Sequence, residues 1–136
     1  MKGMRFIPTR THGMVDYLVG VVLIAAPWIF RFNDVASAKW VAIVVGLLML
    51  GQALMTNYEL GVVPLVPMHL HLMMDSAIGI FLIASPWIFG FSDDRLNAWL
   101  PHVIVGIGEL GIAAMTTPWP ADEADLRRER RLAGAR

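Results

Sequence analysis

The chain has 136 residues, of which 57% are hydrophobic and 16% are charged, and its formal net charge is zero. Soluble domains carry about 25% charged residues, so this chain has too little polar surface for a water-soluble globule. It contains no cysteine, which excludes disulfides, thiol catalysis and cysteine-based metal sites. Its basic residues gather at the two ends of the chain, which argues against nucleic acid as a partner. We therefore expect an integral membrane protein whose main partner is the lipid bilayer.

One sequence pattern occurs twice in the chain. Residues 12–34 and 71–93 align without a gap at an offset of 59, and 13 of the 23 aligned residues are identical. A second match, at an offset of 60, relates residues 46–56 to residues 106–116. Internal repeats predict architecture, because each copy adopts the same local structure. We therefore predict two tandem copies of one structural unit.

Four apolar segments are long enough to cross a bilayer, whose hydrocarbon core is about 30 Å thick. A helix of about 20 residues spans about 30 Å at about 1.5 Å per residue. In chain order, the predicted helices cover residues 12–30, 36–56, 69–89 and 97–117. The expected fold class is all-α: an integral membrane four-helix bundle made of two tandem parallel transmembrane hairpin repeats, related by a pseudo-two-fold axis along the membrane normal.

These helices divide the chain into five parts with different compositions. The parts are an N-terminal segment (1–11), a first hairpin (12–56), an inter-repeat loop (57–68), a second hairpin (69–117) and a charged tail (118–136). The two end segments hold eight basic residues, namely Lys2, Arg5, Arg10, Arg127, Arg128, Arg130, Arg131 and Arg136, whereas the turns inside the hairpins hold Arg31, Lys39 and Arg95. Lysine and arginine are enriched on the cytoplasmic side of membrane proteins. We therefore predict that both termini are cytoplasmic and that the chain lies in a bacterial inner membrane.

Helical spacing places five matching residues of each copy on one face of its first helix. The successive steps of four, four, three and four residues keep them on one side. They are His12, Asp16, Gly20, Leu23 and Pro27 in the first copy, and His71, Asp75, Gly79, Leu82 and Pro86 in the second. A surface that faces lipid has no need for histidine or aspartate. We therefore expect this face to point into the bundle.

The ionisable residues of the helices are predicted to form a polar layer in the cytoplasmic half of the bundle. The layer comprises His12, Asp16, His71, Asp75 and Glu109, with Gln52 at a similar depth, and no lysine or arginine lies at that depth. A charged acid at the bilayer centre costs at least about 2.5–3.5 kcal/mol, and three carboxylates repel one another. Either a carboxyl group is protonated, or the histidines are protonated partners, or a cation lies among these residues.

Three interpretations of this layer stay open. In the structural one, the histidine and aspartate of each copy form a hydrogen-bonded pair one helical turn apart. In the second, His12, Asp16, His71, Asp75 and Glu109 hold a metal ion or an unknown cofactor, since imidazole and carboxylate ligands suit zinc, iron or manganese. In the third, they form a proton or ion path, in which Glu109 breaks the symmetry because Met49 takes its place in the first copy. We expect a structural or interaction role without catalytic residues, and a second copy or another membrane protein is a conceivable partner.

The end of the first helix of each copy carries a short motif. Ser85-Pro86-Trp87 and its near copy, in which Ala26 precedes Pro27 and Trp28, resemble the motif that names the SPW-repeat family of small prokaryotic membrane proteins. The resemblance covers about residues 12–117 and implies that each repeat is a pair of transmembrane helices with the motif on the first. It implies no catalytic residue. Since proline removes a backbone hydrogen bond and ends or bends a helix, we predict that this motif is architectural.

Overall fold

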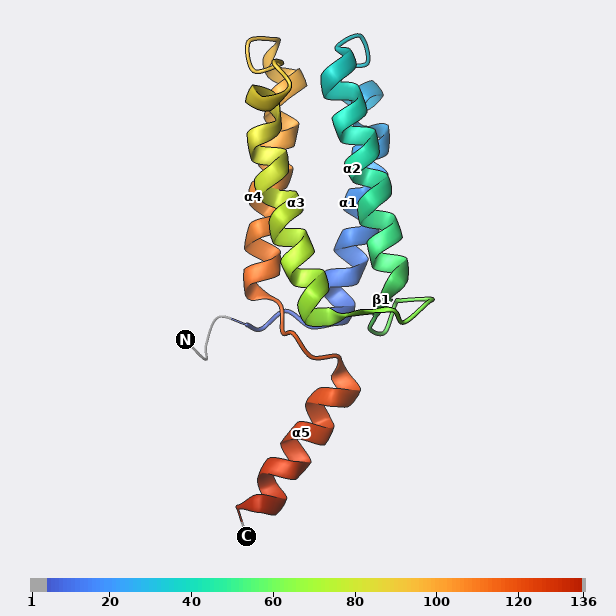
Figure 1. Ribbon diagram of the computed structural model, residues 1–136, viewed down its shortest axis with the longest axis vertical. Helices are drawn as coiled ribbons and strands as arrows, with labels where there is room; N and C mark the ends of the chain where they lie inside the picture. Colours follow the sequence, from blue (N-terminus) through green and yellow to red (C-terminus); the bar gives the residue numbers. More distant parts are fainter. Residues whose placement is uncertain (1–4, 136) are drawn as a thin grey trace.

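The protein is described from a computed structural model that covers residues 5–135, and within this range the chain is mainly helical. The helices are α1 (Thr9–Ile29), α2 (Ala36–Met55), α3 (Met68–Ile88), α4 (Leu96–Met115) and α5 (Ala121–Gly134). Helices α1 to α4 stand side by side as a bundle, and α5 extends from one end of it (Figure 1). We call this end the tail end and the opposite one the far end. The predicted all-α four-helix bundle is confirmed, while Lys2 and Arg136 of the charge argument lie outside the described residues.

Helices α1 to α4 have the length and composition of membrane spans. Each is 20 or 21 residues long, with a mean hydropathy of 1.4 to 1.8 over its most apolar 18 residues. Large apolar side chains such as Leu18, Leu47 and Ile107 are exposed on the outside of the bundle. Contiguous exposed apolar surface of this kind marks contact with a membrane or another apolar partner.

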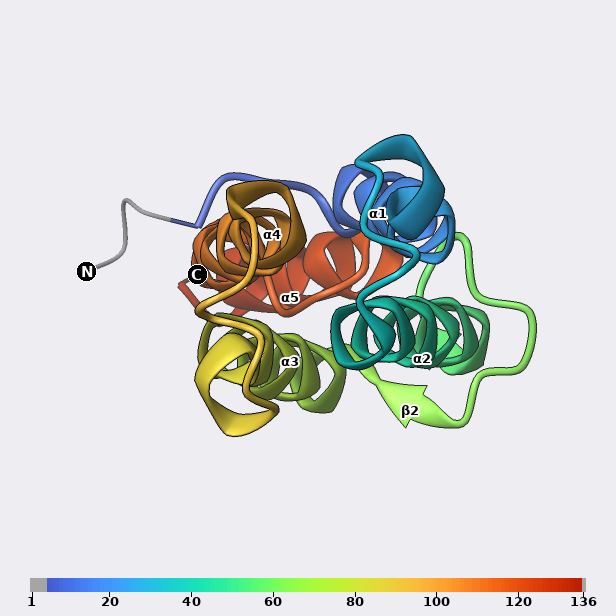
Figure 2. The same ribbon diagram turned by 90° about the horizontal axis from the view of Figure 1, so that it is seen from above.

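Each hairpin is packed tightly around a pair of glycines. Figure 2 shows α1 beside α2 and α3 beside α4. A Cβ atom added to Gly46 would lie 2.7 Å from the carbonyl oxygen of Gly20, and one added to Gly106 would lie 2.6 Å from that of Gly79. Small residues allow helix backbones in membranes to approach closely. The two glycine pairs match each other in the repeat, so both hairpins have the same internal contact.

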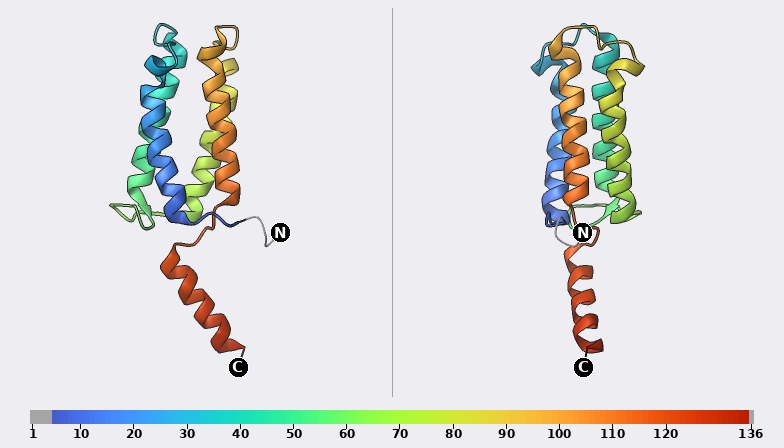
Figure 3. Two further views of the ribbon diagram at one scale, coloured as in Figure 1. Left: turned by 180° about the vertical axis from the view of Figure 1, so that it is seen from behind. Right: turned by 90° about the vertical axis from the view of Figure 1, so that its left-hand side faces the viewer.

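The tail end joins the two hairpins through matching backbone pairings. Strand β1 (Thr56–Asn57), which follows α2, pairs in parallel with β2 (Val66–Pro67), which leads into α3. Ile7 and Thr116, the residues that match Val66 and Thr56 in the repeat, form a parallel bridge. The end of each hairpin therefore pairs with the segment that leads into the other hairpin. This exchange agrees with a pseudo-two-fold arrangement of the hairpins. Figure 3 shows the described part of the N-terminal segment and the inter-repeat loop at the same end of the bundle.

Proline marks both limits of α1 and α3. Pro8 and Pro67 precede the helices in extended conformation, with ψ angles of 148° and 149°. The missing N–H of proline is no loss at a helix start, and α1 therefore begins three residues before the predicted start. Pro27 and Pro86 lie in the last turn of their helices, which end two residues later.

Candidate functional site

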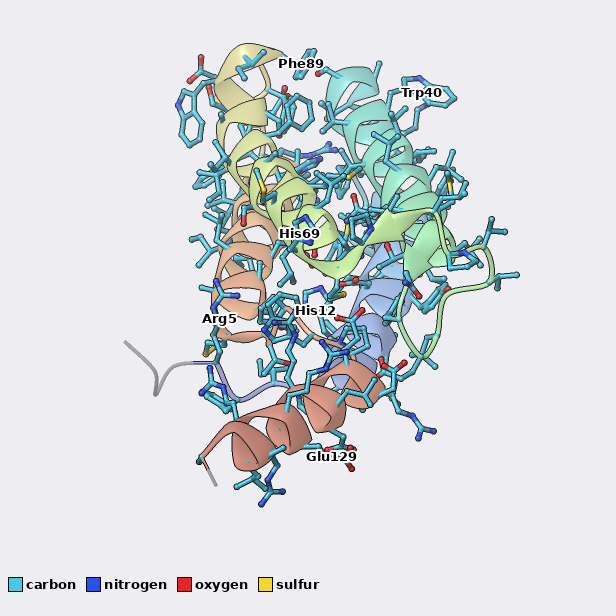
Figure 4. All side chains as sticks on the ribbon, turned by 60° about the horizontal axis from the view of Figure 1, so that its bottom comes forward. Arg5, His12, Trp40, His69, Phe89 and Glu129 are labelled. Carbon is cyan, nitrogen blue, oxygen red and sulfur yellow. The ribbon has the colours of Figure 1, made fainter. Side chains whose placement is uncertain are left out.

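The histidine and aspartate that the two copies share meet inside the tail half of the bundle. His12 and Asp16 of α1 face His71 and Asp75 of α3, and each of the four side chains is at most 1% exposed. One imidazole nitrogen or carboxylate oxygen from each residue lies within 4.8 Å of all the others. We call these four residues the His–Asp ring. Figure 4 shows His12 inside the tail end of the bundle, whereas Trp40 lies on the outside near the far end.

Each histidine of the ring contacts both aspartates. The Nε2 atom of His12 lies 2.9 Å from Oδ2 of Asp75 and 3.2 Å from Oδ2 of Asp16. The Nε2 atom of His71 lies 2.8 Å from Oδ2 of Asp16 and 3.1 Å from Oδ2 of Asp75. The contacts within one helix that the spacing predicts are present, but the shorter contact of each histidine crosses to the other hairpin. The ring therefore links the two hairpins.

Two threonines fix the orientation of the imidazole rings. Nδ1 of His12 lies 2.8 Å from Oγ1 of Thr116, and Nδ1 of His71 lies 2.7 Å from Oγ1 of Thr56. Each threonine hydroxyl donates to the backbone carbonyl four residues earlier, at 2.7 Å for Thr56 and 2.6 Å for Thr116. A hydroxyl has one hydrogen to donate, so each Nδ1 must be the donor in its contact. The other nitrogen of each imidazole, Nε2, faces the carboxylates.

These threonines are site residues that sequence reasoning missed. The repeat alignment matches Thr56 with Thr116, but threonine is common in apolar helices and neither residue carries a charge. Both are fully buried. Their signal was positional: each ends the second helix of its copy, on the same membrane side as the histidine. This position indicates a contact with histidine only once the structure shows that each hairpin end pairs with the start of the other hairpin.

The surroundings of the two aspartates differ. Gln52 of α2 donates a hydrogen bond from Nε2 to Oδ1 of Asp75. The matching Oδ1 atom of Asp16 has no hydrogen-bond partner within residues 5–135. The repeat explains this difference, because Ile112 occupies the place of Gln52 in the second copy. The ring is therefore symmetric in its four members and asymmetric in the groups around it.

Glu109 of α4 is buried but is not a member of the ring. It is 2% exposed, and it lies outside the group of four residues whose ligand atoms converge. Its Oε2 atom has no hydrogen-bond partner in the described part of the chain. Met49, which takes its place in the first copy, is 1% exposed. The interior thus holds a carboxyl group at one position and a thioether at the matching one.

The interior between the ring and the far end is mostly apolar. Leu23, Leu82, Phe32 and Phe91 form two matching pairs, and each is at most 2% exposed. His102 of α4 lies between the phenyl rings, with ring centroids 5.6 Å from Phe32 and 4.9 Å from Phe91. Its Nε2 atom lies 3.0 Å from a backbone carbonyl oxygen of α2. These apolar pairs separate the ring from the far end.

The loop between the hairpins covers the ring at the tail end. The centroid of the Tyr58 phenol group lies 5.9 Å from that of the His71 imidazole. The Tyr58 side chain occupies the space that a Cβ at Gly13 would need. Burial raises the pKa of the Tyr58 hydroxyl above its usual value. The neighbouring Glu59 accepts hydrogen bonds from the Thr9 hydroxyl at 2.6 and 2.8 Å and from the Ala121 N–H at 3.0 Å. Burial alone would raise the pKa of Glu59, but these hydrogen bonds hold it below its usual value.

The Ser-Pro-Trp motif lies at the far end, away from the ring. The indoles of Trp28 and Trp87 are 58% and 61% exposed on the outside of the bundle, as suits the interface between membrane and water. Ser85 is buried and donates a hydrogen bond to a backbone carbonyl of its own helix at 2.8 Å. The prolines and tryptophans of the motif therefore contribute nothing to the ring.

Four apolar helices arranged as two matching hairpins around a buried polar centre define the class of this chain as a multi-pass membrane protein. The family model of the SPW repeat domain matches residues 10–119, and the chain belongs to this family. The matched range contains α2 to α4, all of α1 except Thr9, and every member of the ring, which confirms the resemblance. The comparison with curated proteins gives no match, and neither does the comparison with solved structures.

Proposed function

We propose that the protein is a structural membrane protein in which the His–Asp ring joins two hairpins into one bundle. The observation that carries this proposal is the crossing of the contacts: His12 lies closer to Asp75, and His71 lies closer to Asp16, than either lies to the aspartate of its own helix. Residues that served only their own helix would not need partners from the other hairpin.

Further polar contacts of the ring also run between the hairpins. The histidine–threonine contacts join α1 to α4 and α3 to α2, and Gln52 reaches from α2 to Asp75 on α3. Lipid gives no hydrophobic driving force for helix association, and a hydrogen bond between helices in a membrane contributes about 0.6 kcal/mol on average. Several such bonds in one place therefore add up to a few kcal/mol. Such a free energy is large enough to hold the two hairpins together, which supports the structural role.

A cut between the hairpins tests the joint directly. Val62 and Leu65 are 71% and 66% exposed in the inter-repeat loop, so a protease site inserted at residues 62–65 can be cleaved in the folded chain. We expect the two halves of the cut protein to co-elute in mild detergent. The double substitution His12→Ala and His71→Ala should let them separate, because it leaves two buried carboxylates without their histidine partners.

The matched control for this experiment is Asp34→Asn, which removes an exposed ion pair between the same two hairpins. Its cut halves should still co-elute. Separation of the cut wild-type halves, or co-elution of the halves that lack both histidines, would show that the ring does not hold the bundle together.

The orientation of the chain is part of this proposal. An even number of spans puts both termini on one side, and the distribution of basic residues favours the cytoplasmic side of a bacterial inner membrane. Since the chain has no cysteine, single cysteines placed at Asn33 and Ala133 can be labelled separately with an impermeant maleimide. In intact cells, Asn33→Cys should react and Ala133→Cys should not; the reverse result would invert the orientation.

The alternative of a proton or ion path has weaker support. A path across the membrane needs a continuous series of polar groups. Outside the ring, the buried polar side chains of His102 and Glu109 are interspersed with the apolar side chains of Leu23, Leu82, Phe32 and Phe91. The alternative of a metal site has a specific geometric basis, which is developed below.

A further inference from the structure

We propose that the His–Asp ring also binds one divalent transition-metal ion. The four ligands are Nε2 of His12, Nε2 of His71 and one carboxylate oxygen each of Asp16 and Asp75. This goes beyond the structural role, because the joint needs only the hydrogen bonds, whereas the metal site needs free lone pairs aimed at a common point.

The spacing of the four atoms suits an ion at their centre. Zinc lies about 2.1 Å from nitrogen and oxygen ligands, so four ligands at that distance are about 3.0 Å apart along the sides of a square and about 3.4 Å apart in a tetrahedron. The four Nε2–Oδ2 distances of the ring are 2.8 to 3.2 Å. These side lengths fit those of the square arrangement that copper(II) and nickel(II) prefer. The tetrahedral arrangement of zinc needs an expansion of a few tenths of an ångström.

The neighbours of the ring hold the ligands in the form that a metal requires. A histidine that binds a metal almost always donates its other ring N–H to a nearby acceptor. Thr116 and Thr56 are such acceptors for Nδ1 of His12 and His71. The Nε2 lone pairs are then available to the ion, and the protons that Nε2 donates to the carboxylates in the metal-free protein go to the solvent.

Charge balance favours a divalent ion. Two carboxylates and one divalent cation sum to zero, and the two histidines are neutral when they bind a metal through Nε2. A neutral centre avoids the cost of a net charge inside a membrane. A monovalent cation would leave one negative charge, and a trivalent cation would leave one positive charge.

Unpaired buried oxygens provide independent support. Four side-chain oxygens are buried without a hydrogen-bond partner within the described range, namely those of the carboxyl groups of Asp16 (Oδ1) and Glu109 (Oε2), the amide of Gln52 (Oε1) and the hydroxyl of Tyr58. Buried polar atoms are nearly always paired, and an exception calls for an explanation such as a bound ion. A cation in the ring would place positive charge near these oxygens. Asp16 needs such a charge more than Asp75 does, because Ile112 stands where a second amide donor would be.

Metal uptake by the full chain tests the proposal. The protein is purified in detergent without a histidine tag, stripped with a chelator, and dialysed against Zn²⁺, Ni²⁺, Cu²⁺ or Mg²⁺. We expect one ion per chain for the first three metals and none for Mg²⁺, which prefers octahedral oxygen sites. Bound Cu²⁺ should show two coordinated nitrogens in its electron paramagnetic resonance spectrum.

The variants separate the metal site from the joint. The double substitution Asp16→Asn and Asp75→Asn removes both negative charges but offers an amide N–H donor to Nε2 of each neutral histidine, so the cut halves should still co-elute while metal uptake is lost. Thr56→Val and Thr116→Val leave the four ligands in place and should weaken metal binding about 10–100-fold, as loss of a group that orients a ligand does. His69→Gln, which changes an exposed histidine on α3, is the matched control and should bind metal as the wild type does.

The proposal is overturned if the stripped wild type takes up no metal, or if the variant with two asparagines takes up as much as the wild type. Neither result affects the structural role, which the co-elution of the cut halves decides.

Discussion

The two hairpins are linked near both ends by ion pairs whose surroundings are opposite. Near the tail end, the four ring residues are at most 1% exposed and lie on the interior faces of α1 and α3. At the far end, Nη2 of Arg95 lies 2.6 Å from Oδ1 of Asp34, but these side chains are 52% and 63% exposed. Breaking a buried pair leaves an uncompensated charge in a poor solvent, whereas water compensates an exposed one. The comparison teaches that burial, more than distance, decides which link holds the bundle.

The repeat draws the same distinction. Each copy contributes one histidine and one aspartate to the ring, so the buried contact between the hairpins is made twice, as His12–Asp75 and as His71–Asp16. The exposed link is made once, because Asp34 has a counterpart in Asp93, whereas Val35 precedes α2 at the position where Arg95 precedes α4. The link that occurs twice is therefore the buried one, whose loss is expected to cost more free energy of unfolding.

The largest effect is expected from the loss of one ring carboxylate. Asp75→Ala removes one of the two carboxylate partners of each histidine and the acceptor of Gln52, and removal of one member of a buried pair costs about 3–5 kcal/mol. Unfolding in mixed micelles, followed by circular dichroism, measures the change. The control Asp93→Ala alters an exposed aspartate and should leave the unfolding free energy almost unchanged. Equal effects of both substitutions would mean that burial does not distinguish the two ends.

A smaller effect is expected inside a hairpin. The Cβ of Gly106→Ala would meet the carbonyl oxygen of Gly79 at 2.6 Å, which forces α3 and α4 apart and should destabilise the bundle by about 1–3 kcal/mol. Gly108 is the matched control on the same helix, because a Cβ there meets nothing within 4 Å. Gly108→Ala should stabilise the chain by up to about 1 kcal/mol through helix propensity. Thermal unfolding of both variants in detergent measures these changes. An equal loss of stability in both would show that the close approach of Gly106 to Gly79 is not the cause.

Glu109→Met is expected to act in the opposite direction. It gives α4 the residue that α2 carries at Met49 and removes a buried oxygen without a partner. In chelator-treated protein it should raise stability by about 1–3 kcal/mol, the cost of leaving a buried polar group unsatisfied. The reciprocal variant Met49→Glu should lower the unfolding free energy in the same assay. A destabilised Glu109→Met would show that Glu109 has a partner in the metal-free protein.

Sequence patterns predicted the parts of this molecule that depend on one helix at a time. Spans follow from apolar length, and the stripe with His12 and Asp16 follows from spacing on one helix face. The start of α1 was placed three residues late because Pro8 carries no apolar signal, although it is a good residue to precede a helix.

Contacts between helices were beyond such patterns. The spacing of four residues indicates a contact between His12 and Asp16, but it contains no information about the relative height of α1 and α3, which makes Asp75 the closer partner. That height depends on the backbone pairings of Thr56 and Thr116 at the tail end. Glu109 was predicted at the depth of the ring, yet its carboxyl oxygens do not join the group of converging ligand atoms, which depends on how α4 packs against α1 and α3.

The smallest effect is expected at the exposed link. Asp34→Asn removes the Asp34–Arg95 ion pair, but the unfolding free energy at neutral pH should hardly change, because water screens exposed charges. The hydrogen bond from Arg95 lowers the pKa of Asp34 in the folded protein. The contribution of the pair is therefore present above the ordinary pKa of aspartate and is lost as the pH falls through the lowered value. Wild type and Asp34→Asn should have unfolding midpoints that nearly coincide at pH 7 and coincide fully in strong acid. If Asp34→Asn were as damaging at neutral pH as Asp75→Ala, exposure could not be what separates the two ends, and the far end would also hold the hairpins together.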